Sequence, residues 1–219
     1  MKNINRQTFS RLFLGFFFCA LSTSFEIHSN LGMGAWSVFH QGVSKLLGIS
    51  FGQVSILCSL AIIIIVSALG QRVGLGTILN MLLIGWLIDF FDYFHLIADA
   101  GSLAQGTMMI FLSMIFNALG SCFYIACGLG CGPRDGLMSA LTQKSHLSVG
   151  LIRFTIEGVV FLVGWKLGGQ IGLGTVLNVF SIGFIINGTY KIMDFNIASV
   201  HHQTLTETLH YLRGGFTCL

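Results

Sequence analysis

The sequence contains a gapless internal repeat, in which residues 29–88 align with residues 127–186 at a constant offset of 98. Sixteen of the 60 aligned positions are identical. Shared apolar composition can produce matching Leu and Ile, but it does not bring glycines and polar residues into register. The chain therefore contains a duplication. The identical glycine and polar pairs are Gly32 and Gly130, Gly34 and Gly132, Ser50 and Ser148, Gly52 and Gly150, Gly70 and Gly168, Gly74 and Gly172, Gly76 and Gly174, Thr77 and Thr175, Asn80 and Asn178, and Gly85 and Gly183.

The composition indicates that the chain lies in a lipid bilayer. Its mean hydropathy is +0.83, and only 9% of its residues are charged, whereas soluble domains carry about 25%. The uncharged runs 51–71, 100–133 and 167–190 each exceed the roughly 18 residues that indicate a membrane span. We therefore expect a single membrane domain over residues 1–219 with no soluble domain. The net charge of +3 is modest and spread through the loops, so no nucleic-acid partner is expected.

The apolar runs predict an all-α fold with six transmembrane helices. Two further segments, 35–47 and 133–145, are too short and polar to cross, and are expected to be half-depth or interfacial helices. The repeat units extend over about 12–95 and about 110–193, followed by a cytoplasmic tail, 194–219. The six spans are expected near 12–28, 50–69, 77–95, 106–127, 149–167 and 175–192.

Three crossings per unit is an odd number, so the second unit is expected to be inverted relative to the first. Lysine and arginine accumulate on the cytoplasmic side of membrane proteins, and they do so here if both termini are cytoplasmic. We expect 12–27 to be a retained span, because it aligns with the interior segment 110–125. The inner segments carry Lys2, Arg6, Arg11, Arg72, Arg134, Lys144, Lys191 and Arg213, and the outer ones carry Lys45 and Lys166.

A glycine-rich break precedes the second short helix, where residues 128–136 read Gly-Leu-Gly-Cys-Gly-Pro-Arg-Asp-Gly. Pro133 suits a first helical turn, and the free N–H groups of a helix start favour an anion. Two interpretations stay open. Arg134 and Asp135 form a cytoplasmic helix cap, or they bind a solute that approaches the backbone at Gly130 and Gly132.

Arg153 and Glu157 stand four residues apart in the fifth predicted span, so they share one helix face and can pair. A charge at mid-bilayer costs on the order of 2.5–3.5 kcal/mol on insertion scales, so we expect both to face the protein interior near Arg134 or Asp135. A structural ion pair and a solute or proton site are equally compatible with this spacing.

Secondary candidates lie near the outer end of the first span and after two glycine-rich turns. Glu26 and His40 form a weaker polar cluster, in which a lone histidine is more often a structural contact than a ligand. Asn80 and Asn178 each follow a threonine that suits a helix N-cap, and such asparagines can hydrogen-bond across helices.

No metal or cofactor is expected, because the six cysteines lie mostly in apolar runs and the pair Cys127 and Cys131 lacks further ligands at zinc spacing. No nucleophile motif or phosphate-binding loop is present either, so an enzyme is disfavoured.

The chain resembles the YczE/YyaS-type family of bacterial integral membrane proteins, also grouped with YitT-like proteins, over roughly residues 12–190. The segments that carry the resemblance are 128–138, 148–157 with Arg153 and Glu157, and 172–178. The family pattern has a Pro and an acid in the first half, where this chain has Ala35-Trp36-Ser37. The resemblance implies a location in the bacterial inner membrane, and it implies architecture more than activity.

Two functions remain open. Duplicated halves with broken helices and buried charges are typical of secondary transporters, here for a small polar or anionic solute bound between the repeats. The alternative is a non-transporting accessory or assembly protein, in which the glycines serve packing alone. The lipid bilayer is the expected partner in both cases, and a homodimer stays open.

Overall fold

The computed structural model describes residues 6–71, 73–145, 147–195, 200 and 203–208, and within them the chain is entirely helical with no strand. Lys2, Arg72, Arg213, Cys218 and most of the predicted tail lie outside the described residues. The described helices of 13 or more residues are α1 (Arg6–His28), α2 (Ala35–Leu47), α3 (Phe51–Ala68), α4 (Leu75–Tyr93), α5 (Leu103–Ala126), α6 (Pro133–Ser145), α7 (Val149–Lys166) and α8 (Leu173–Ile192).

Five of these helices, α1, α3, α4, α5 and α8, are long and apolar enough to cross a membrane. α7 is 18 residues long but carries Arg153, Glu157 and Lys166, and this charge separates it from the other five. α2 and α6 have 13 residues each, which at 1.5 Å per residue gives about 20 Å. That length falls short of the roughly 30 Å hydrocarbon core.

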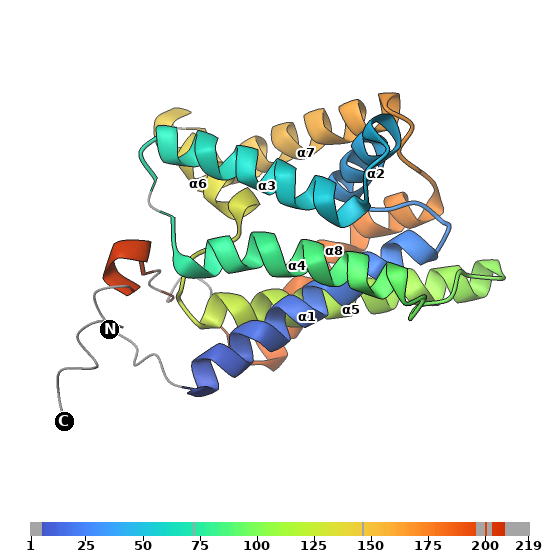
Figure 1. Ribbon diagram of the computed structural model, residues 1–219, viewed down its shortest axis with the longest axis horizontal. Coiled ribbons are helices and arrows are strands. Elements are labelled where there is room, and N and C mark those ends of the chain that lie inside the picture. Colours follow the sequence, from blue (N-terminus) through green and yellow to red (C-terminus); the bar gives the residue numbers. More distant parts are fainter. Residues whose placement is uncertain (1–5, 72, 146, 196–199, 201–202, 209–219) are drawn as a thin grey trace.

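The helices form two layers (Figure 1). One layer contains α1, α4, α5 and α8, and the other contains α2, α3, α6 and α7. α1 and α5 cross at the centre of the first layer, where Gly15 lies against the backbone of Gly120 and Tyr124. A side chain at Gly15 would overlap that backbone, so glycine permits the close crossing. Leu12, Phe16 and Tyr124 are buried beside it.

Each half of the chain is joined to the other by an equivalent pair of backbone contacts. Gly174 N donates to Leu31 O at 2.7 Å, and Gly76 N donates to Leu129 O at 2.7 Å. The loop glycines at these crossings have positive φ, +96° at Gly32 and +125° at Gly130, a conformation that favours glycine. The duplicated glycines thus place each half's loop against the start of the other half's last helix.

The C-terminal region also contributes to the fold, which the sequence did not predict. Gln203 N donates to Gly128 O at 2.7 Å, and Leu205 N donates to Val73 O at 3.0 Å. Thr208 is fully buried. Residues 203–208 therefore pack onto the loops before α4 and α6.

Candidate polar site between the two halves

Glu26, near the end of α1, is a buried carboxylate with three hydrogen-bond donors around it. Asn178 Nδ2 of α8 donates to Oε1 at 2.7 Å. Ser37 Oγ of α2 donates to Oε2 at 2.8 Å, and Gly34 N donates to the same oxygen at 3.4 Å. Donors on both oxygens are what an ionised carboxylate requires. Glu26 thus links three helices drawn from both halves of the chain.

The second half contains a matching acid–hydroxyl pair with the two groups exchanged between the helices. Tyr124 of α5 occupies the position equivalent to Glu26, and Asp135 of α6 occupies the position equivalent to Ser37. Tyr124 Oη donates to Asp135 Oδ2 at 3.2 Å. The first short helix has Ser37 where the second has Asp135, and Glu26 of α1 supplies the carboxylate in the first half.

Trp36 and Arg134 occupy equivalent positions in the two halves, and they contact each other. The Arg134 guanidinium carbon lies 4.8 Å from the centre of the Trp36 ring, within the range of a cation–π interaction. Electrostatic interactions also connect Arg134 to Asp135 and Glu26. Arg134 therefore lies where the equivalent positions of the two halves meet.

The side chains of Arg134 and Asp135 have exposed surface even though α1, α2 and α5 contribute neighbours to them. Glu26 and Tyr124 are buried at the same centre. The exposed surface of this charged pair leaves it accessible to a solute. We refer to Glu26, Trp36, Tyr124, Arg134 and Asp135 as the central polar site.

His40 of α2 lies beside the central polar site but is enclosed by aromatic rings. Its ring centre is 5.6 Å from that of Phe51 and 6.3 Å from that of Trp36. Burial, and to a lesser degree the charge of Arg134, lower the pKa of His40 well below its ordinary value of 6.5. The imidazole is therefore neutral at physiological pH.

The predicted glycines divide between two roles. Gly132 lies at the site, because a Cβ there would stand 3.2 Å from Tyr124 Oη and 3.4 Å from Asp135 Oδ2. Gly130 instead serves the crossing, where its surroundings are Thr77 Oγ1 and Gly74. Thr77 Oγ1 also donates to Cys131 O at 2.6 Å.

The structure does not bring the other predicted residues to the central polar site. Arg153 Nε and Glu157 Oε1 form the expected ion pair at 2.9 Å, but their side chains are 55% and 43% exposed. The expectation that this pair is enclosed in the interior is wrong for this arrangement, because α7 does not pack on α8. Asn80 of α4 is half-buried, whereas its equivalent Asn178 is buried.

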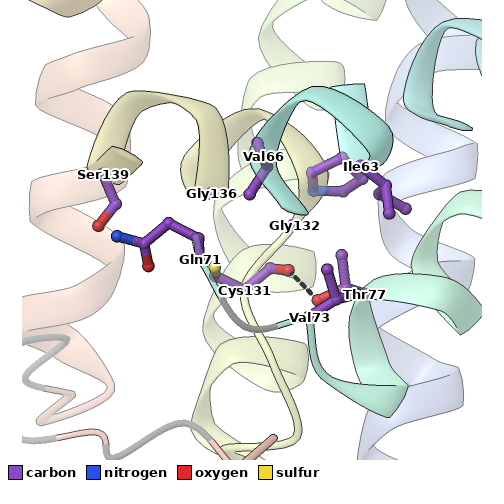
Figure 2. Close-up of a pocket in the computed structure, with 10 residues that line it drawn as sticks. Ile63, Val66, Gln71, Val73, Thr77, Cys131, Gly132, Gly136 and Ser139 are labelled. Carbon is purple, nitrogen blue, oxygen red and sulfur yellow. Dashed lines mark hydrogen bonds between the residues drawn. The ribbon is translucent and has the colours of Figure 1, made fainter. Parts of the chain in front are cut away.

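A small pocket of about 40 Å³ lies next to the site, between α3, α4 and α6 (Figure 2). Val66, Thr77, Cys131 and Gly136 are among its lining residues. Its polar groups are few, and the Thr77 hydroxyl is already engaged. Among the described residues, no group of three or more His, Cys, Asp or Glu side chains could hold a metal ion.

The sequence analysis missed Trp36, Ser37 and Tyr124. The sequence does contain a signal for these residues. At the repeat offset, Glu26 aligns with Tyr124 and Ser37 aligns with Asp135, so an acid aligns with a hydroxyl in both cases. Because the acid and the hydroxyl change places between the two halves, neither aligned pair is identical, and a comparison that counts only identical residues does not find them.

Comparison with known proteins identifies the family. The sequence model of DUF6198, described as a family of unknown function, matches residues 6–191. The chain belongs to this family. It is 35% identical over 178 residues to an uncharacterized membrane protein YczE of Bacillus subtilis, covering 80% of this chain and 81% of that one. The predicted membership of a YczE-type family is confirmed.

Two further relatives have similar lengths. An uncharacterized protein of Haemophilus influenzae is 33% identical over 180 residues, which is 82% of each chain. The uncharacterized protein YyaS of Bacillus subtilis is 23% identical over 196 residues, covering 87% of this chain and 96% of that one. No solved structure matches. The relative described as a membrane protein, together with five apolar helices, indicates a multi-pass membrane protein.

Proposed function

We propose that the protein is a small secondary transporter whose solute binds at the central polar site. The observation that carries the proposal is the cluster of Glu26, Arg134 and Asp135 between the two halves, in which Arg134 and Asp135 have exposed surface. Ionisable residues inside a membrane bundle are costly and are typical of solute or ion pathways. Sites between duplicated halves are typical of transporters.

The charges of the site favour a solute that carries a positive group. Two carboxylates and one guanidinium leave the site with a net negative charge, and the Trp36 ring offers a face to a cation. A zwitterion such as an amino acid could place its ammonium near Glu26 or Asp135 and its carboxylate near Arg134. This charge balance argues against a simple anion.

The proposed membrane topology has six crossings, with α7 as the fifth, and both termini in the cytoplasm of a bacterial inner membrane. Three crossings per unit make the two units inverted. The reciprocal contacts of Leu31 with Gly174 and Leu129 with Gly76 support this relation. α2 and α6 then enter the bilayer from opposite sides and meet where Trp36 contacts Arg134.

Counterflow in proteoliposomes tests the proposal. Vesicles preloaded with alanine, choline or acetate are given the same labelled solute outside, which probes a zwitterion, a cation and an anion. We expect saturable uptake of alanine or choline but not of acetate. Glu26→Gln and Asp135→Asn should abolish that uptake. Asp92→Asn, which changes an exposed carboxylate outside the site, should retain it.

The accessory-protein alternative makes a different prediction. A folded, reconstituted protein that moves none of the three solutes, and whose thermal stability is unchanged by each of them, would favour that alternative. The glycine crossings at Gly32 and Gly130 would then serve packing only.

A further inference from the structure

α3 and α4 of the first half pack closely through two glycines and one carboxylate. A side chain on Gly52 would overlap the carbonyl of Gly85, and one on Gly85 would overlap Ile56 and the Gly52 carbonyl. Asp89 of α4 accepts from Ser50 Oγ at 2.5 Å and from Gly52 N at 2.8 Å. The Asp89 carboxylate therefore caps the start of α3 from the neighbouring helix.

The second half has the same two glycines but lacks this packing. Over their described residues, α7 and α8 do not pack on each other as α3 and α4 do. Neither Gly150 nor Gly183 has a neighbouring atom within 4 Å of the place its Cβ would occupy. Val179 of α8 is 63% exposed, whereas the equivalent Met81 of α4 is 9% exposed.

The substitutions between the halves give a physical reason for this difference. Arg153 and Glu157 on α7 occupy the positions of Ser55 and Ser59 on α3, which are each only 8% exposed. Packing α7 onto α8 in the same way would bury an ion pair, and desolvating such a pair is costly. Asn187 replaces Asp89, so the capping group has also lost its charge.

We propose that α7 and α8 form a gate that closes by adopting the packing that α3 and α4 show. In the closed gate, Gly150 lies against Gly183, Asn187 caps the start of α7 at Ser148 and Gly150, and the Arg153–Glu157 pair faces the interior. The structure holds this gate open. The inference rests on the proposed function only for the gate's role in solute movement, because the closure itself can be measured without a solute.

Disulfide cross-linking in membranes tests the closure. In a variant with all six native cysteines replaced by Ala, the pair Ser148→Cys/Asn187→Cys reports on α7 and α8. Its equivalent, Ser50→Cys/Asp89→Cys, reports on the packed helices and serves as the positive control. The pair Gly158→Cys/Gly188→Cys is the negative control, because the equivalent Leu60 and Phe90 side chains are exposed. We expect oxidation to cross-link the first two pairs and not the third.

Two further changes should shift the cross-linked fraction of the Ser148→Cys/Asn187→Cys pair in opposite directions. Arg153→Ser/Glu157→Ser restores the residues of α3 and should raise that fraction several-fold, because closure then buries no charge. Gly183→Phe should abolish the cross-link by blocking the glycine contact. Gly188→Phe is its matched control, since the equivalent residue is Phe90, and it should leave the fraction unchanged.

The gate is refuted if the Ser148→Cys/Asn187→Cys pair stays uncrosslinked even with Arg153→Ser/Glu157→Ser while the Ser50→Cys/Asp89→Cys pair reacts. It is equally refuted if Gly183→Phe leaves the cross-link intact. If the cross-links form as expected but the protein shows no counterflow, the closure of α7 on α8 is supported and the transport function is rejected. If counterflow occurs but the Ser148→Cys/Asn187→Cys pair never cross-links, transport is supported and the closure is rejected.

Discussion

At the scale of single residues, the central polar site depends on the Glu26 carboxylate, which accepts hydrogen bonds from Ser37, Gly34 and Asn178. Glu26 is bonded by side chains 11 and 152 residues away, so its loss leaves donors unpaired on both α2 and α8. A buried donor without a partner costs about 1–3 kcal/mol, more when its partner was charged. The site is therefore also part of what holds the two layers together.

We expect Glu26→Gln to lower the free energy of unfolding by about 2 kcal/mol, because the new amide turns one N–H toward existing donors. Ser37→Ala removes a single donor and should cost about 1 kcal/mol or less. Thermal unfolding in detergent measures both. Equal stability of Glu26→Gln and the parent protein would show that this carboxyl is already protonated in the folded state.

At the same scale, the loop glycine Gly130 should tolerate a side chain less well than Gly48. Both have positive φ, but Gly48 has open space around it, whereas a Cβ on Gly130 would meet Thr77 Oγ1. Gly48→Ala should cost about 1–2 kcal/mol from backbone strain alone. Gly130→Ala should cost visibly more in the same unfolding assay. Similar losses would mean that the crossing of the halves relaxes freely.

At the scale of helices, the two equivalent pairs α3–α4 and α7–α8 should respond differently to the same change. Gly52→Ala forces Cβ into the Gly85 backbone, and such overpacking typically costs about 1–3 kcal/mol. Gly150→Ala meets nothing and should be neutral or stabilising by up to about 1 kcal/mol, because alanine favours helix over glycine. Unfolding of the two single variants in detergent compares them directly, and equal losses would contradict an open second pair.

The elements were predictable to the extent that they depend on local pattern. The apolar runs predicted helices close to those observed, and the glycines of 128–136 predicted the break before α6. The crossings of the two halves at Gly32 and Gly130 were not predicted. The openness of α7 and α8 was not predictable, because Gly52 and Gly85 are conserved between the halves as Gly150 and Gly183. The difference depends on the balance between helix packing and the desolvation of Arg153 and Glu157, which no local pattern expresses.

The partners of the central polar site were predictable only in part. Glu26 and Asn178 were both candidates, but their contact joins residues 152 positions apart. Arg134 and Asp135 were placed correctly at a helix start. Their contacts with Trp36 and Tyr124 follow from the relation between the two halves, which the alignment alone does not supply in three dimensions.

At the scale of the whole molecule, the number of crossings decides whether the two halves can be inverted. Of the six described helices with 18 or more residues, α7 is the one whose charged side chains, Arg153, Glu157 and Lys166, set it apart from the candidate spans. It is 18 residues long, about 27 Å at 1.5 Å per residue, which nearly matches the roughly 30 Å hydrocarbon core. Its length therefore permits a crossing.

Reporter fusions after residues 100 and 219 test this crossing. With six crossings and a cytoplasmic N-terminus, residue 100 follows three spans and lies outside, while residue 219 follows six and lies inside. If α7 lay on the membrane surface, only five helices would cross and both reporters would be outside. Fusions after residues 147 and 169 bracket α7 and should report inside and outside. The same side for that pair would reject the inverted arrangement, because the second half would then cross an even number of times.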